Sequence, residues 1–187
     1  ESGTVTVARA ARSSEFPARF QLVAAMNPCP CGWAGDPSAH CRCSPENIRR
    51  YRARISGPLM DRIDLHVEVP RLPPQDLRPD APEGEPTAAI RLRVEAARAT
   101  QHARAGKANA QLGQSETMAC CRLQDRDQAL LERAIERLQL SARSMHRILR
   151  VARTIADLAG ADAIATPHLT EALGYRRADR GDARNAA

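Results

Sequence analysis

The sequence predicts a mixed α/β chain in which short strands precede a proline-rich segment and helices follow it. Three observations predict this class. Residues 3–7 and 20–25 read as strands, six prolines lie between Pro70 and Pro86, and the following residues carry apolar side chains at helical spacing. Apolar residues make up 43% of the chain and aromatic residues only 3%. The core is therefore expected to consist of Leu, Ile, Val and Ala, a composition that favours helices.

The part before the prolines is expected to contain three strands and one helix. Residues 20–25 are a short apolar run, typical of a strand buried on both faces, and residues 8–19 between the first two strands read as a connection or hairpin. Ser44 and Pro45 predict the start of a helix that runs to about Ile55, because a hydroxyl can cap it and proline is harmless at its first position. Residues 56–58 end this helix, and residues 65–69 alternate enough to form a strand.

Four helices are expected after the prolines. Thr87 can cap the first, which carries Ile90, Val94 and Ala97 on one face and ends at Gly106. Asp125 has capping-box spacing to Gln128 and opens the second helix.

The third helix of this group has the strongest pattern. Ser141 can cap it, Gly160 closes it, and its apolar stripe comprises Met145, Ile148, Leu149, Ala152, Ile155, Ala156 and Ala159. Thr166 and Pro167 open a last short helix through Leu173.

The chain is basic, with a formal net charge of +6, and Lys107 is its only lysine. Arginine forks match phosphate and carboxylate groups, so nucleic acid or a nucleotide is one explanation of the arginine excess. A genome that favours arginine codons is the other, and charge alone does not separate them. No apolar run approaches the ~20 residues of a membrane span and no signal peptide is visible, so we expect a cytoplasmic protein without a membrane partner.

Four cysteines form a candidate metal site. Cys29, Cys31, Cys41 and Cys43 make two C-x-C pairs separated by nine residues, and four thiolates at this spacing can surround a tetrahedral Zn²⁺. Reduced loop thiols and disulfides are the alternatives, and His40 is a further candidate ligand.

Trp33 lies within the cysteine loop, whereas Cys120 and Cys121 lie far from it in the sequence. Trp33 is available to stack on a nucleic-acid base if the loop touches DNA. The adjacent Cys120 and Cys121 are instead expected to pack in the helical part.

Two polar residues stand where phosphate chemistry is possible. Asn27 follows the predicted strand 20–25, and ligands bind at the carboxyl ends of strands in open α/β sheets. A turn-starting Asn before a proline is the simpler interpretation. Arg62 lies between Asp61 and Asp64, so it is either a surface ion-pair residue or an arginine finger that neutralises charge on a transferred phosphoryl group.

Three long motifs in order carry a family resemblance. LVAAMNPCPCG (22–32), CRCSPENIRRYRARISGPLMDRIDLHVEVP (41–70) and LSARSMHRILRVARTIADLAG (140–160) resemble the ComM/YifB branch of the magnesium-chelatase-like AAA+ ATPases. The resemblance implies that Asn27 is the sensor 1 residue, that Arg62 is an arginine finger acting in trans, and that Arg143 is the sensor 2 arginine that contacts ATP phosphate. It also implies ATP and Mg²⁺ as cofactors, a hexamer of the full-length protein, and DNA as partner.

The resemblance further implies a domain organisation. Residues 1–69 would be the carboxyl-terminal portion of an AAA+ core with the cysteine-rich loop 27–43. Residues 70–86 would be a linker, residues 87–176 an all-α helical lid, and residues 177–187 a disordered tail. Because the chain opens at Glu1 inside a strand pattern, we expect a piece of a longer protein.

One departure from the family pattern limits the ATPase activity expected of this chain alone. No G-x-x-x-x-G-K-[ST] phosphate loop occurs and no acidic Walker B strand is visible, so this polypeptide alone is expected to be inactive as an ATPase. The expected parent function is an ATP-driven DNA motor of the branch-migration helicase type, in natural transformation or recombination. A magnesium-chelatase ATPase subunit and a zinc-bearing nucleic-acid-binding module without motor activity are the alternatives.

Overall fold

The computed structural model describes residues 3–9, 12–37 and 40–177. The chain divides into two compact units, Glu1–Ile48 and Arg49–Ala187, and each is described by itself. The expected tail 177–187 lies outside the described residues except for Arg177, which belongs to the last helix.

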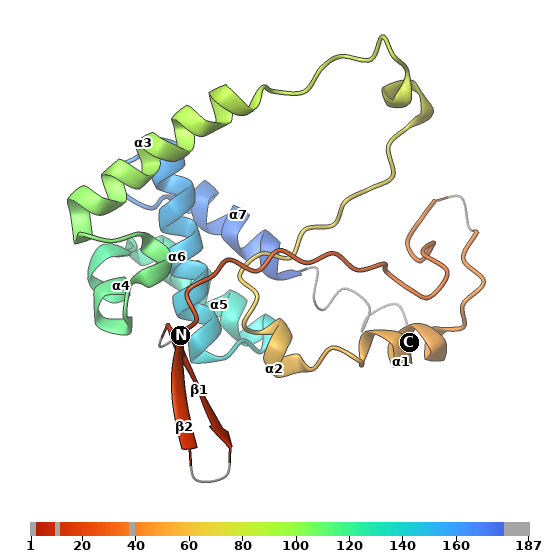
Figure 1. The fold of residues 1–187 in the computed structure, drawn as a ribbon. Coiled ribbons are helices and arrows are strands. Elements are labelled where there is room, and N and C mark those ends of the chain that lie inside the picture. The colour runs from red at the N-terminus through yellow and green to blue at the C-terminus, as the bar shows by residue number, and fades with distance from the viewer. Residues whose placement is uncertain (1–2, 10–11, 38–39, 178–187) are drawn as a thin grey trace. The chain divides into compact units, whose positions relative to one another are not determined.

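A β-hairpin begins the first unit (Figure 1). Strands β1 (Thr4–Arg9) and β2 (Arg12–Pro17) are antiparallel, with Thr4 opposite Pro17 and Arg9 opposite Arg12. The side chains of both strands are exposed along their whole length. The strand expected at residues 3–7 is therefore confirmed, and the connection after it is a hairpin.

The two other predicted strands are wrong. Residues 20–25 and 65–69 have irregular backbone, and Val23 and Val69 are 84% and 86% exposed. Among the described residues, β1 and β2 are the only strands and they pair with each other. Neither apolar run has a neighbouring strand with which to complete a ladder, and an apolar pattern cannot supply one.

The helix after the cysteine loop begins where the sequence predicts. Helix α1 spans Pro45–Arg52, and the Asn47 N–H donates to Ser44 Oγ at 3.3 Å. A separate short helix, α2 (Gly57–Met60), follows Ser56. The proline-rich segment contains only a short 3₁₀ turn, η1 (Pro74–Leu77).

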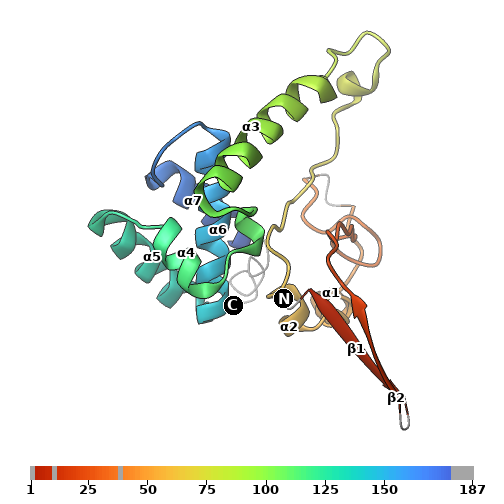
Figure 2. The same cartoon turned by 60° about the vertical axis from the view of Figure 1, so that its left-hand side comes forward.

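Up to Arg177, where the described part of the second unit ends, five helices follow the prolines, one more than expected. They are α3 (Thr87–Ala105), α4 (Gln114–Cys120), α5 (Asp125–Leu138), α6 (Ala142–Leu158) and α7 (Thr166–Arg177), with a 3₁₀ turn η2 (Asn109–Gln111) before α4. Helix α6 lies at the centre and packs against α3, α4, α7 and η2, as the two views show (Figures 1 and 2). The sequence missed α4 because it spans less than two turns and carries little periodicity.

The predicted caps are right at some ends of these helices and wrong at others: Pro86 is the N-cap of α3, so Thr87 is its first residue and does not cap it. The Ser144 N–H donates to Ser141 Oγ at 3.2 Å, which confirms the predicted cap of α6. Gly106 ends α3 with φ of 68°, a left-handed conformation that glycine adopts at no steric cost. The capping box predicted for α5 is wrong, because Gln124 is the N-cap and makes no side-chain cap bond.

The apolar core lies where α6 meets its neighbours. Leu131, Ile148, Leu149 and Leu169 are buried in one cluster, and Cys121 belongs to it while Cys120 packs against it. This confirms that the adjacent cysteines pack in the helical part. The pKa of Cys121 is raised to about 12, chiefly by burial.

One face of α3 is less buried than its pattern predicts. Ala97 is buried, whereas Ile90 and Val94 are more than a third exposed. Only the second half of α3 reaches α6, so the first half retains an exposed apolar stripe.

None of the helices in the described part of the chain combines the length and the apolarity needed to span a membrane.

Candidate functional site

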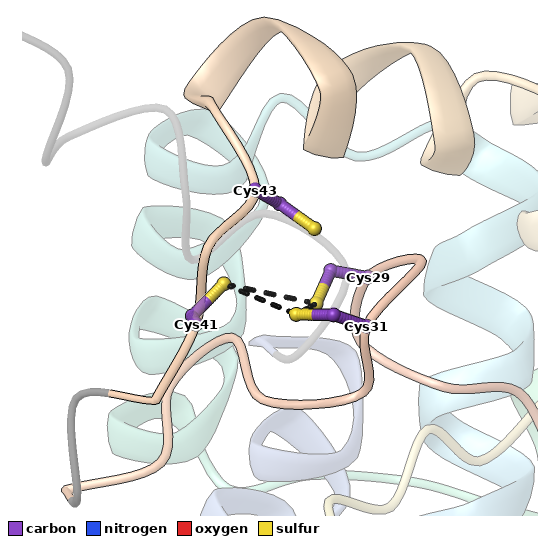
Figure 3. Close-up of side chains that lie close together, drawn as sticks. All are labelled: Cys29, Cys31, Cys41 and Cys43. Atoms are coloured by element: carbon purple, nitrogen blue, oxygen red, sulfur yellow. Dashed lines mark hydrogen bonds between the residues drawn. The ribbon is translucent and has the colours of Figure 1, made fainter.

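The four predicted cysteine ligands lie together in the first unit. Their Sγ atoms are all within 4.8 Å of one another, and Figure 3 shows the sulfurs turned toward a common centre. Cys29 and Cys31 lie on the loop after residue 27, and Cys41 and Cys43 lie on the segment that leads into α1. Cys29 is fully buried, whereas Cys31 is exposed. All six cysteines of the chain are described, and none forms a disulfide.

A tight turn between the first two cysteines brings the thiols together. The Gly32 N–H donates to the Cys29 carbonyl at 3.0 Å, and Gly32 has φ of 81°, which favours glycine. The Ala34 N–H donates to Cys29 Sγ at 3.3 Å. The loop backbone therefore directs N–H groups at a sulfur, as expected around thiolates that carry negative charge.

The sulfur separations fit a tetrahedral zinc site. With Zn–S bonds of about 2.3 Å, the sulfurs of a regular tetrahedron lie about 3.8 Å apart. Cys29 Sγ lies 3.8 Å from Cys41 Sγ, Cys31 Sγ lies 3.7 Å from Cys41 Sγ, and Cys29 Sγ lies 3.3 Å from Cys31 Sγ. The donor set and its spacing suit a thiophilic cation, and this cluster can hold a metal ion.

The local backbone favours ionisation of two of these thiols. Burial and the Cys31 thiol act to raise the pKa of Cys29, but backbone hydrogen bonds from Ala34 and Trp33 outweigh them and the pKa is lowered. A backbone hydrogen bond from Arg42, followed by one from Trp33, lowers the pKa of Cys31 to about 6. A lowered pKa favours the thiolate, and the thiolate is the form of cysteine that ligates a metal.

The other pair has the opposite tendency. A backbone hydrogen bond from Cys31 acts to lower the pKa of Cys43, but its contact with the Cys31 thiol and desolvation raise it to about 11. For Cys41 a backbone hydrogen bond from Cys43 is likewise outweighed, by desolvation and by the neighbouring thiols, and the pKa is raised. Neighbouring thiolates repel one another. A bound cation would offset this repulsion, because its positive charge compensates the negative charge of the four sulfurs.

A small hollow lies beside the cluster. It has a volume of about 380 Å³ and is lined by Cys31, Trp33, His40 and Arg42. The rings of Trp33 and His40 are 5.0 Å apart at 46°, a tilted aromatic contact. His40 therefore contacts Trp33, and the four cysteines alone complete a tetrahedral donor set. Arg42 in this hollow was not singled out by the sequence, where it is one of many arginines.

Asn27 lies on the same loop, in the first unit. Its side chain is exposed, and its amide Nδ2 lies beside Gly32. Because residues 20–25 are not a strand, Asn27 does not stand at a sheet edge among the described residues. The sensor 1 role stays a prediction.

Arg62 and Arg143 belong to the second unit. The Arg62 side chain is exposed, and its Nη1 donates to the Pro58 carbonyl at 2.7 Å. Arg143 is exposed in the first turn of α6. One turn later on α6, Arg147 donates to the carbonyl of Arg62 and to Asp64 Oδ1. Sequence reasoning missed Arg147, because nothing local reveals a contact between residues 85 positions apart.

Comparisons with known proteins cover nearly the whole chain. The family described as magnesium chelatase, subunit ChlI, matches residues 1–77, and its ChlI C-terminal family matches residues 84–176. The chain is 51% identical over 177 residues to "Competence protein ComM" of Haemophilus influenzae, covering 94% of the chain and 34% of that protein. It is 45% identical over 181 residues to YifB of Escherichia coli, covering 96% of the chain and 35% of YifB.

A more distant relative is matched over the same share of its length. An uncharacterized protein of Mycobacterium tuberculosis is 39% identical over 181 residues, which are 95% of the chain and 35% of that protein. The chain thus spans about a third of the length of the curated relatives it matches. On these grounds the chain belongs to the magnesium-chelatase-like AAA+ family, among proteins of the ComM and YifB type.

Proposed function

We propose that the chain is the carboxyl-terminal part of an ATP-driven hexameric motor that acts on DNA, of the branch-migration helicase type. In this motor Asn27 acts as sensor 1, Arg62 as the trans-acting arginine finger, and Arg143 as sensor 2. Similarity to a protein named for competence supports a role in natural transformation or recombination.

The single observation that best supports this proposal is the arrangement around α6. The helix carries Arg143 in its first turn, where backbone N–H groups and the helix dipole favour an anion. One turn later, Arg147 contacts the backbone of Arg62. Two exposed guanidinium groups with the chemistry of phosphate binding are therefore linked through one helix of the second unit.

The residues present fit ATP only in part. Asn27, Arg62 and Arg143 can orient water and neutralise phosphate charge, but the chain has no loop that would cradle the phosphates or hold Mg²⁺. ATP and Mg²⁺ supply the transferable phosphoryl group and its charge neutralisation in the parent protein. The chain alone is expected to show no ATP hydrolysis and only feeble nucleotide affinity, and micromolar ATP binding in calorimetry would contradict the expected affinity.

The arginine finger can be tested by substitution in the full-length parent. Arg62→Ala is expected to lower the kcat of ATP hydrolysis by about 10³-fold, because arginine fingers contribute at least this much. Arg54→Ala removes an exposed arginine eight positions earlier and is the matched control, expected to stay within about twofold. Equal, small effects of both variants would refute the finger.

The family description also names magnesium chelatase, so a magnesium-chelatase ATPase subunit is the alternative function. The two functions are distinguished by their substrates. A DNA motor shows ATP hydrolysis that rises with branched or single-stranded DNA. A chelatase subunit instead supports Mg²⁺ insertion into a porphyrin and is indifferent to DNA.

We further propose that the cysteine cluster holds Zn²⁺. The support is that two of the sulfur separations, 3.8 and 3.7 Å, match the edge of a zinc–thiolate tetrahedron. The purified chain is expected to contain about one zinc per molecule by elemental mass spectrometry. Cys41→Ser is expected to lose the metal, whereas Cys120→Ser, outside the cluster, is expected to retain it. Metal content that is equally low in both, or equally high, would contradict the site.

A nucleic-acid contact on this loop is the second candidate function, favoured by the hollow beside the cluster. Its indole and guanidinium groups suit a stacked base and its phosphate. Binding of a fluorescent oligothymidylate by the chain is expected to weaken with salt, and Trp33→Ala is expected to reduce affinity by about tenfold. Phe16→Ala, which removes an exposed aromatic ring of β2, is the control. Equal affinities for the two variants would exclude this contact.

A further inference from the structure

Arg147 is a buried arginine whose partners lie far away in the sequence. Its side chain is 7% exposed, on α6 in the middle of the helical core. Its Nη1 donates both to the backbone carbonyl of Arg62 and, at 2.7 Å, to Asp64 Oδ1. A buried guanidinium is costly unless it is paired, so these contacts to residues 62–64 are favoured once the arginine is buried.

The segment that receives these bonds has little structure of its own. Arg62 follows the single turn of α2, with its N–H bonded to the Leu59 carbonyl at 2.9 Å. Residues 65–69 form no strand. Further along, the His66 N–H donates to the Tyr175 carbonyl on α7 at 3.1 Å. The backbone at Arg62 is therefore held in place by helices α6 and α7 and not by a sheet.

The chemistry of the contact suits backbone positioning. Arg147 binds the main-chain oxygen of Arg62, so it leaves the Arg62 guanidinium exposed. Asp64 is half exposed and supplies charge, which strengthens the bond and orients the fork. An arginine finger acts only if its guanidinium reaches the transferred phosphoryl group, and the position of its Cα determines that reach.

We propose that Arg147 is a positioning residue for Arg62: it fixes the backbone from which the finger extends and itself touches no nucleotide. This inference rests on the proposed function of Arg62 and deepens it. Helix α6 would thus determine whether the finger is in place, although α6 lies outside residues 1–69, the expected AAA+ core portion that carries Arg62.

The expected effect lies below that of removing the finger. A displacement of about 1 Å at a catalytic group costs on the order of 10²-fold in rate. In the full-length parent, Arg147→Ala is therefore expected to lower the kcat of ATP hydrolysis by about 10- to 100-fold with little change in KM. Arg147→Lys keeps the charge but replaces the planar guanidinium, whose Nη1 donates to both acceptors, with an ammonium on a flexible stem, so it is expected to give an intermediate kcat.

Arg150→Ala is the matched control. Arg150 lies on the same helix, is half buried, and donates to a different backbone carbonyl, that of Leu112, at 2.9 Å. It removes a similar arginine–carbonyl bond without touching residues 62–64. Its kcat is expected to stay within about threefold of the parent, and thermal unfolding of all variants confirms that each is folded at the assay temperature.

A double-mutant cycle separates positioning from general damage. If Arg147 acts through Arg62, then the variant carrying both Arg62→Ala and Arg147→Ala has the same kcat as Arg62→Ala alone. Independent, multiplying effects would overturn the proposal, as would an Arg147→Ala variant that behaves like Arg150→Ala while Arg62→Ala is strongly impaired. If Arg62→Ala itself keeps full activity, the proposed finger fails first, and the positioning role fails with it.

Discussion

Asp157 is a highly connected charge of the helical unit, and its removal gives a sharp stability test. Its side chain is fully buried on α6. Arg104 on α3 donates through both Nη atoms, at 2.9 and 2.6 Å to the two carboxylate oxygens. Arg153 Nε donates at 3.1 Å, and Asn109 Nδ2 on η2 donates at 2.8 Å. The carboxylate thus joins α3, η2 and α6.

The substitution Asp157→Asn keeps the shape and removes the charge. It leaves the buried Arg153, whose side chain is 3% exposed, without its carboxylate, and it places an NH₂ group against arginine donors. Breaking a buried pair in this way costs about 3–5 kcal/mol. Arg104 is 23% exposed and recovers part of its hydration, so we expect the lower end, about 3 kcal/mol. This corresponds to roughly a 150-fold change in the unfolding equilibrium constant.

The exposed pair Arg93–Glu85 provides the matched control. It is also a bidentate arginine–carboxylate pair, but its side chains are 55% and 42% exposed. Glu85→Gln is therefore expected to cost less than about 1 kcal/mol. The assay is urea unfolding of the chain followed by helical circular dichroism. Losses that agree within about 0.5 kcal/mol for the two variants would refute the view that burial makes the Asp157 network important.

Three further predictions concern helix ends. A hydrogen bond from Lys107, followed by one from the Gly113 N–H, lowers the pKa of Glu116, so its contribution is present above pH ~4.3 and is lost as pH falls through the lowered pKa. Glu116→Gln should flatten the stability profile below pH 5, and an unchanged slope would contradict this. Ser141→Ala should cost about 1 kcal/mol in urea unfolding, whereas Ser141→Asp should restore the cap. Gly106→Ala should destabilise by about 1 kcal/mol through its positive φ, although nothing crowds the position; a stabilised variant would exclude strain there.

The helices of the second unit were predictable because their signals are local. Three such features depend only on residues close together in the sequence, and each is confirmed. They are the apolar stripe of α6, its Ser141 cap and the glycine that ends α3. Helix α4 escaped because it has seven residues, too few for a periodic pattern. The strand predictions at 20–25 and 65–69 failed because a strand depends on partners that a local pattern does not contain.

The cysteine cluster was equally predictable from spacing. Cys29 to Cys43 lie close together along the chain, and a turn at Gly32 shapes the first of the two pairs. The roles of Asn27, Arg62 and Arg143 came from resemblance and stay predictions. Arg42 beside Trp33 was not foreseen, because a single exposed arginine has no pattern of its own.

The amino-acid sequence by itself thus determined most of the helices, the Ser141 cap, the glycine end of α3 and the grouping of four thiols, since each depends on residues close together along the chain. Only the tertiary structure decided that Arg147 binds the backbone of Arg62, that Asp157 joins three helical elements, and that the apolar run at 20–25 stays exposed. The physical reason is that these features depend on which distant groups compensate a buried charge or complete a sheet, and sequence spacing does not encode such partners.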